Sequence, residues 1–192
     1  MAANIEYVDG DLLVFKTDII VQQCNCLTIT SHGLSKTIAD KYPEADIYKN
    51  RHRIGNRNLS VVADRGVPGT CILTEITSNN DSNCRYVASI LGQWRPSKVT
   101  TSYSNIYPES IPRETMKQRE IWFQKGLIDL ETKLSEKSSQ NELNNCNSIA
   151  FPYLIGCGLA GGNWENFLHY IEEFANRNPK LTIYIVKLPS CH

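Results

Sequence analysis

Four glycines within seven residues form the segment of this chain best suited to chemistry. The run Gly156 to Gly162 follows a short apolar stretch and leads into a helix-like stretch that starts at Asn163. Glycine permits positive φ and close approach of a ligand to the backbone. Successive amides can then point inward, assisted by the positive end of the following helix, and hold a phosphate or diphosphate. The run lacks the lysine and Ser or Thr of a Walker sequence, which argues against nucleoside-triphosphate hydrolysis. A tight strand-to-helix turn without a ligand would have the same spacing.

A second polar segment, Gln22 to Leu34, connects another apolar run to a helix-like stretch. Asn25 stands at the end of the apolar run, where a buried amide must find hydrogen-bond partners. It can therefore bind a ligand hydroxyl or tie down the loop. His32 lies next to Gly33 and can act as an acid, a base or a ligand contact near neutral pH. An exposed histidine without a function is the alternative.

A third segment, Asp9-Gly10-Asp11, follows the first apolar run. The carboxylate of Asp11 can accept a hydrogen bond from an exocyclic amine, and Gly-Asp is also a common turn.

The elements that position these segments alternate between strands and helices. Short apolar or β-branched runs predict strands, and apolar residues that recur every three to four positions predict helices. The predicted strands are 5–8, 18–24, 69–77, 85–91, 148–154 and 182–188, and the predicted helices are 33–42, 44–53, 113–137 and 163–176. This alternation predicts an α/β fold, a three-layer α/β/α sandwich with a mixed, mainly parallel sheet of about six strands. We expect one domain over residues 1–192, with ligands at the carboxyl ends of the strands.

Two segments lie outside this alternation. Residues 92–112 are rich in Ser, Thr and Pro and are long for a loop, so they are either a functional lid or disordered. Residues 49–57 are basic. We interpret them as a solvated loop, with a phosphate-contacting patch as the alternative.

Bulk properties exclude several classes of protein. The 20 basic and 20 acidic residues give zero net charge, which argues against a protein that coats polyanions. No apolar run approaches the roughly 20 residues of a membrane span, and residues 1–15 lack the features of a signal peptide. We therefore expect a cytoplasmic protein, with the nucleus as the alternative. The seven cysteines are odd in number and include no CxxC pair, so we expect reduced thiols, no metal and no cofactor.

The order of the three polar segments resembles the macrodomain family. Gly10 to Leu13 is similar to the family's early Gly-Asp-aliphatic motif, Val21 to Cys26 to its Val-Asn-Ala-Ala-Asn segment, and Ile155 to Leu159 to its phosphate loop. The resemblance covers residues 5–188. Because Trp164-Glu165 follows soon after the loop, the chain is most similar to the branch of terminal ADP-ribose protein glycohydrolase and ADP-ribose 1''-phosphate phosphatase.

The resemblance implies a fold, a ligand and a role for each matched residue. The ligand would be ADP-ribose or an ADP-ribosyl conjugate, including ADP-ribosylated protein, and neither nucleic acid nor membrane is the expected partner. Asp11 and the Leu12 amide would bind the adenine, with Tyr184 beside it. Asn25 would bind the distal ribose, and Gly33 would line the ribose and diphosphate. The diphosphate would lie against Ile155, Gly156, Cys157, Gly158, Leu159, Ala160 and Gly161.

The chain departs from the family at the catalytic positions. Ala160 stands where the glycohydrolase has its catalytic Asp, and Ile90 stands where it has its catalytic Lys, with Lys98 the nearest lysine downstream. His32 replaces the lysine that DNA-directed relatives use.

Three functions remain open after these departures. The first is an enzyme that hydrolyses an ADP-ribose derivative at the distal ribose, with His32 as the catalytic acid–base or nucleophile and Asn25 orienting the ribose. The second is a non-catalytic reader of ADP-ribose. The third is an eraser of ADP-ribose from nucleic acid that uses the basic residues of 49–57 and 94–98.

Overall fold

Six strands form one sheet in the order β1-β6-β5-β2-β4-β3. The computed structural model describes residues 4–77, 83–99, 114–139 and 146–189. Every neighbouring pair is parallel except β3 and β4, which are antiparallel. The predicted mixed, mainly parallel sheet is therefore confirmed. The strands are β1 (Ile5–Asp9), β2 (Ile19–Asn25), β3 (Cys71–Glu75), β4 (Tyr86–Gln93), β5 (Ser148–Pro152) and β6 (Thr182–Lys187).

In the described part of the chain, three α-helices and two short 3-10 helices lie between the strands. They are α1 (Leu34–Lys41), η1 (Pro43–Ala45), η2 (Val62–Asp64), α2 (Met116–Ser139) and α3 (Trp164–Arg177). The helix predicted over 44–53 is wrong, because only η1 forms there. Past η1 the side chain of Asp46 accepts a hydrogen bond from the Tyr48 amide at 2.9 Å. This local bond stabilises a turn and competes with helix formation.

The helix predicted over 113–137 begins later than expected. Thr115 and Gln118 form a reciprocal cap, in which each side chain accepts a hydrogen bond from the other residue's amide, at 2.9 and 3.2 Å. Such a capping box fixes the first turn of a helix, here at Met116. Of the irregular segment 92–112, Gly92 and Gln93 belong to β4, residues 94–97 form bends, and residues 98–99 have no regular structure. Residues 100–112 lie outside the described residues.

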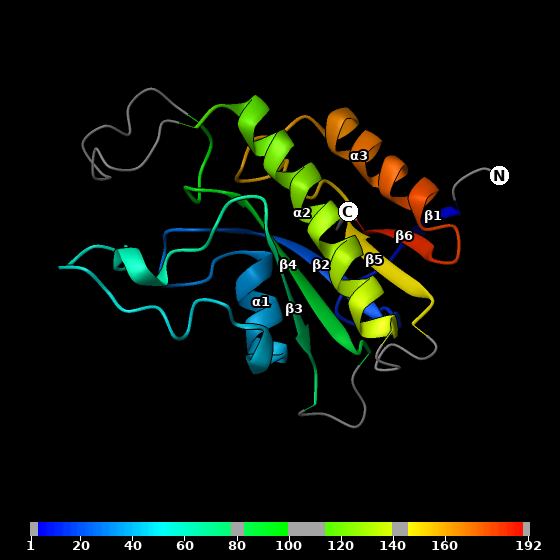
Figure 1. Ribbon diagram of the computed structural model, residues 1–192, viewed down its shortest axis with the longest axis horizontal. Coiled ribbons are helices and arrows are strands. Elements are labelled where there is room, and N and C mark those ends of the chain that lie inside the picture. Colours follow the sequence, from blue (N-terminus) through cyan, green and yellow to red (C-terminus); the bar gives the residue numbers. More distant parts are fainter. Residues whose placement is uncertain (1–3, 78–82, 100–113, 140–145, 190–192) are drawn as a thin grey trace.

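Helices cover both faces of the sheet and give the predicted three layers. Ile19 and Val21 of β2 pack into the cluster that contains the buried residues of α2 and α3. Ile20, between them, packs into the cluster that contains Ile38 of α1. Figure 1 shows α2 and α3 side by side over one face. Strand β2 is thus buried on both faces, as expected for a central parallel strand. Among the described helices, none has both the length and the apolarity needed to cross a membrane.

The topology brings the polar segments to one edge of the sheet. Strands β2, β4 and β5 run in the same direction, so the chain segments that follow them meet at their carboxyl ends. A bulge shifts the register there: Cys24 pairs with Leu91, and Asn25 then pairs with Gln93. Gly92 is the extra residue, so the bulge re-aims the end of β4.

The close packing of α2 on β4 depends on Gly126. A Cβ at this position would lie 2.4 Å from Cγ2 of Ile90. We predict that Gly126→Ala lowers the free energy of unfolding by about 1–3 kcal/mol through overpacking, although alanine has the better helix propensity by about 1 kcal/mol. Urea unfolding followed by circular dichroism measures the change. Ser135→Ala, at an exposed position of the same helix, is the control that should not lose stability. Equal or higher stability of Gly126→Ala would contradict the contact.

Candidate functional site

A cavity of about 330 Å³ lies at the carboxyl edge of the sheet. This volume is at the lower end of the range of about 300–1,000 Å³ that is typical of small-molecule sites. Its walls come from the end of β2 and start of α1, from the end of β4, and from the loop after β5. The lining residues are Gln23, Asn25, His32, Gly33, Leu34, Ser35, Tyr48, Gln93, Pro96, Pro152, Tyr153, Leu154, Ile155, Gly156, Gly158, Leu159 and Ala160.

The glycine loop, residues 156–162, forms one wall and leaves several backbone donors unused. Gly156 and Gly161 have φ of 73° and 75°, and the Gly162 amide donates to the Gly156 carbonyl at 2.9 Å. Among the described residues, no group accepts a hydrogen bond from the amides of Gly156, Gly158, Leu159 or Ala160. Because all four residues line the cavity, their amides are available to an anion or another acceptor.

The helix whose free N-terminus can assist the glycine loop in binding an anion is α1. It is not α3, which directly follows the loop in the sequence and was the expected helix. The side chain of Asn163 accepts a hydrogen bond from the Glu165 amide and thereby caps α3. By contrast, Gly33 at the start of α1 provides no side-chain cap, and the first turn of α1 has no acidic residue. Gly33, Leu34 and Ser35 line the cavity, and their amides donate to no group in the described part of the chain. The positive end of the α1 dipole therefore faces the same cavity as the glycine loop.

Asn25 ties down the loop after β2. Its Oδ1 accepts hydrogen bonds from the amides of Leu27 and Thr28, at 3.0 and 2.8 Å, and from the Thr28 hydroxyl at 3.0 Å. Its Nδ2 donates to the Tyr48 hydroxyl at 3.3 Å. Of the two predicted roles, loop fixation is therefore present in the structure. Asn25 also lines the cavity, where its amide group has one further hydrogen to donate.

Tyr48 and Arg51 support Asn25 from a segment that sequence reasoning did not assign to the site. The Tyr48 hydroxyl accepts a hydrogen bond from the Asn25 amide at 3.1 Å, and burial raises the pKa of Tyr48 well above its ordinary value. The Arg51 guanidinium lies 4.6 Å from the centre of the Tyr48 ring and donates to the carbonyls of Asn25 and Thr28, at 3.2 and 2.8 Å. Interpreting all of 49–57 as a solvated loop is therefore wrong at Arg51. An aromatic residue near an arginine was the only available sequence signal.

His32 lies on the exposed rim of the cavity. Its Nε2 is 3.3 Å from the Thr30 hydroxyl. The start of α1 and the glycine loop approach each other near His32, since a Cβ on Gly33 would lie 3.9 Å from Cδ1 of Leu159. The structure thus places His32 and Asn25 on the same cavity, as the candidate roles require.

The residues expected at the adenine do not line this cavity. Asp11 is exposed and its Oδ1 accepts a hydrogen bond from the Leu13 amide at 2.9 Å. Leu12 is buried in the cluster that Tyr184 packs against, and the Tyr184 ring meets Phe15 edge-on at 4.9 Å. Tyr184 belongs to β6, and Asp11 and Leu12 follow β1. In the sheet, β6 and β1 lie beyond β5, on the side opposite to β4.

Two residues expected at the diphosphate also lie outside the cavity lining. They are Cys157 and Gly161. The Cys157 thiol donates to the Ile155 carbonyl at 3.3 Å, and burial raises its pKa to about 11. This thiol is consequently protonated near neutral pH and is a poor nucleophile.

Ile90 and Ala160 stand at the two positions where the resemblance implied a catalytic Lys and a catalytic Asp. Ile90 is fully buried against α2 and does not reach the cavity, so the β4 residue that lines it is Gln93. Ala160 lines the cavity with a methyl side chain. The side-chain carbons of Lys98 lie beside the glycine loop, because a Cβ on Gly161 would be 2.8 Å from Lys98 Cγ.

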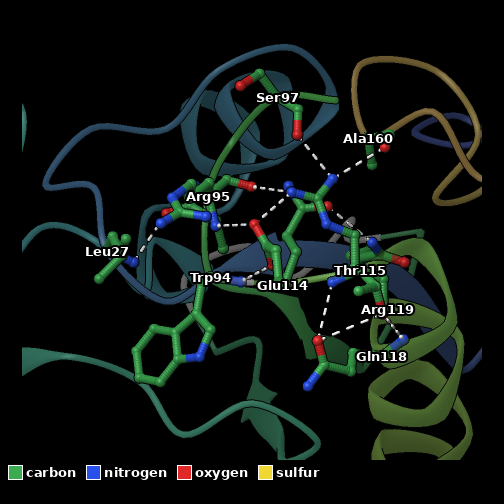
Figure 2. A network of polar contacts seen from close by, with 12 residues as sticks. Leu27, Trp94, Arg95, Ser97, Glu114, Thr115, Gln118, Arg119 and Ala160 are labelled. Carbon is green, nitrogen blue, oxygen red and sulfur yellow. Dashed lines mark hydrogen bonds and ion pairs between the residues drawn. The ribbon is translucent and has the colours of Figure 1, made fainter. Parts of the chain in front are cut away.

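A buried arginine connects two walls of the cavity, as Figure 2 shows. Arg119, on the first turn of α2, is fully buried and donates to the carbonyls of Ser97 and Ala160 at 2.7 and 2.9 Å, and to that of Arg95 at 3.3 Å. Its charge is balanced by Glu114, 2.5 Å away and also buried. The Glu114 carboxylate in turn accepts hydrogen bonds from the amides of Trp94 and Arg95, at 2.8 and 3.1 Å.

The structure offers no cluster of metal ligands in its described ranges. No three His, Cys, Asp or Glu side chains lie close enough together there to hold a metal ion. Cys24 is buried, and desolvation raises the pKa of its thiol to about 11.

Comparisons with known proteins identify the fold. No protein-family model and no curated protein sequence matches the chain. Among solved structures, the macrodomain of Mycobacterium tuberculosis DarG is 20% identical, with a TM-score of 0.65, and the match covers 98% of this chain and 100% of that chain. An Oceanobacillus iheyensis macrodomain mutant with ADPR is 16% identical, with a TM-score of 0.59 over 97% and 86% of the two chains. A Trypanosoma brucei macrodomain in complex with ADP is 14% identical, with a TM-score of 0.57 over 97% and 65%. The chain therefore has the macrodomain fold.

Removal of the buried charge on Arg119 should destabilise the protein strongly. We predict that Arg119→Met lowers the free energy of unfolding by about 3–5 kcal/mol, because Glu114 is left buried without a counter-charge. Lys36→Met is the matched control, since Lys36 pairs with Asp40 on the exposed face of α1 and should cost at most about 0.5 kcal/mol. Chemical denaturation curves of both variants give the two values. A similarly small loss of stability in both variants would show that the buried Arg119–Glu114 pair contributes no more than an exposed ion pair.

Proposed function

We propose that this protein binds ADP-ribose, with the diphosphate in the cavity between the glycine loop and α1. The observation that carries the proposal is that two sets of unused backbone amides belong to residues that line one cavity. The first set is Gly156, Gly158, Leu159 and Ala160, and the second is Gly33, Leu34 and Ser35. A diphosphate supplies acceptor oxygens for both sets and a negative charge for the uncapped helix.

The solved structures support the same ligand. The Oceanobacillus iheyensis macrodomain structure contains ADPR, and the Trypanosoma brucei structure contains ADP. The strand order also fits a ligand with two sugars. Asp11 follows β1, the glycine loop follows β5, and Gln93 ends β4. An adenosine beside Asp11 and Tyr184 would therefore place the distal ribose beyond the diphosphate, over the ends of β2 and β4.

One backbone amide of the loop provides a direct test. Leu159 is the second residue of the turn that is closed by the hydrogen bond from the Gly161 amide to the Gly158 carbonyl. Proline is favoured at this position of a turn. Leu159→Pro removes one unused donor and breaks no bond in the described structure. We predict that it weakens ADP-ribose binding at least about tenfold, the effect of losing a hydrogen bond to a charged group.

Isothermal titration with ADP-ribose measures this change. Leu159→Ala is the control, because it keeps the amide while it removes the exposed side chain, and we expect its affinity to be close to wild type. If both variants bind as tightly as wild type while thermal melts show intact folding, the loop amides do not contact the diphosphate.

We further propose that the protein hydrolyses an ADP-ribose derivative at the distal ribose, either the 1''-phosphate or an ADP-ribosyl conjugate. The support is the position of His32 on the rim of the cavity that Asn25 also lines. His32 would be the acid–base, and Asn25 would orient the ribose through its remaining amide hydrogen.

This proposal predicts separate effects on turnover and affinity. His32→Ala should lower turnover by about 10²–10⁴-fold, the usual contribution of a general acid–base, while ADP-ribose affinity stays near wild type. Product release from the 1''-phosphate and from ADP-ribosyl-glutamate gives the rate. An unchanged rate in this variant would eliminate His32 as the catalytic group.

A non-catalytic reader is the second candidate. It is favoured by Ala160, whose methyl group lines the cavity, and by the burial of Ile90 away from it. Tight ADP-ribose binding without product from the 1''-phosphate, ADP-ribosyl-glutamate or O-acetyl-ADP-ribose would establish this alternative.

A further inference from the structure

Two glutamine side chains form a polar pair in the cavity. Binding of an anion by the backbone amides gives this pair no role. Gln23, on β2, donates from Nε2 to Oε1 of Gln93, on β4, at 3.0 Å. Both residues line the cavity, and Gln93 is only 7% exposed. The bulge at Gly92 creates this pair, because it shifts Gln93 into register with Asn25, next to Gln23.

The pair is held in place by close packing. A Cβ on Gly92 would lie 2.8 Å from Cδ of Gln23, and a Cβ on Gly156 would lie 2.6 Å from its Oε1. Two glycines, Gly92 in β4 and Gly156 in the glycine loop, therefore leave just enough room for the Gln23 amide group. Such a slot fixes the rotamer of Gln23 and directs its oxygen toward the glycine loop.

Each glutamine retains one unused hydrogen-bonding group. Gln23 Oε1 is buried and has no partner, and Gln93 Nε2 donates to no group in the described ranges. Buried polar atoms without partners are uncommon and cost free energy. The pair thus contains one acceptor and one donor without partners among the described residues. Exchanging the oxygen and nitrogen in both amides would preserve this combination, since the two amides bond to each other.

The chemistry of the pair selects a neutral group that both donates and accepts. A hydroxyl or a carboxamide carries both the donor and the acceptor that the two unused groups lack. A phosphate monoester near neutral pH has little to donate, so Gln23 Oε1 would remain unpaired beside a negative charge. Among the described residues that line the cavity, none is a lysine or an arginine.

We infer that Gln23 and Gln93 bind the terminal sugar of the ligand and select a neutral hydroxyl or amide there over a phosphate. The inference rests on the proposed function, because the strand order places the distal ribose over the ends of β2 and β4 only if the diphosphate occupies the glycine loop. The inference limits the ligands to ADP-ribose and to ADP-ribose conjugates whose linkage at the terminal sugar is neutral.

Two near-isosteric variants and three ligands test the pair. Gln93→Glu replaces the free donor with an acceptor, and Gln23→Met removes the free acceptor while its length fills the slot. Titrated at pH 8, both variants should bind ADP-ribose at least about tenfold more weakly than wild type, and both should bind ADP, which lacks the terminal sugar, as wild type does. Wild type should bind ADP-ribose 1''-phosphate at least about tenfold more weakly than ADP-ribose.

A pH series separates recognition from a structural effect. Binding of ADP-ribose by Gln93→Glu should recover between pH 8 and pH 5. Burial at this position raises the pKa of the new carboxyl above its ordinary value, and the protonated carboxyl regains one donor. Asn176→Asp, which adds the same charge at an exposed position of α3, should show no such recovery.

Four results would overturn the inference. They are equal weakening of ADP and ADP-ribose in the variants, full affinity of both variants for ADP-ribose, tight binding of the 1''-phosphate by wild type, and the same pH dependence in wild type as in Gln93→Glu. If wild type does not bind ADP-ribose at all, the proposed function is wrong as well. If wild type binds ADP-ribose and one of the four results is found, only the inference about the glutamine pair is wrong.

Discussion

A single buried guanidinium holds the walls of the cavity in register. Arg119 contacts the carbonyls of Ala160, in the glycine loop, and of Ser97, after β4, so loops from two strands share one fixed point. In the residues that the structure describes, neither loop has regular secondary structure that would fix its position. Glu114 makes this arrangement feasible, because an unpaired buried charge would be far more costly than the contacts it makes. The exposed cavity surface thus depends on a charge pair beneath it.

The site divides into parts with different chemistry along the edge of the sheet. Over β5 and α1 it offers backbone amides and a helix terminus, which suit an anion whatever the side chains are. Over β2 and β4 it offers the side chains of Asn25, Gln23 and Gln93, which suit neutral polar groups. Backbone amides tolerate sequence change, whereas a glutamine pair does not. Specificity among related ligands should therefore depend on the β2–β4 part, and general affinity on the amides.

The sequence predicted the features that depend on local patterns. The six strands, the three-layer architecture and the glycine loop follow from residues that are close together in the chain, and all are present. The site was predicted less completely, because much of it depends on long-range pairing. Gln93 reaches the cavity only through the bulge at Gly92, and Tyr48 only because its segment folds back under Asn25. A charged residue in the first turn of a helix, such as Arg119, normally indicates a solvated position. Nothing in its sequence context indicated complete burial.

The uncapped start of α1 has a consequence for how the empty protein behaves in solution. Gly33 leaves the first turn without a side-chain acceptor, so water or a small anion must serve that turn when no nucleotide is present. The measured stability of the empty protein will consequently depend on the buffer, with sulfate or phosphate raising the melting temperature relative to chloride at equal ionic strength. Melting temperatures taken in phosphate would then understate the stabilisation expected from the proposed diphosphate ligand.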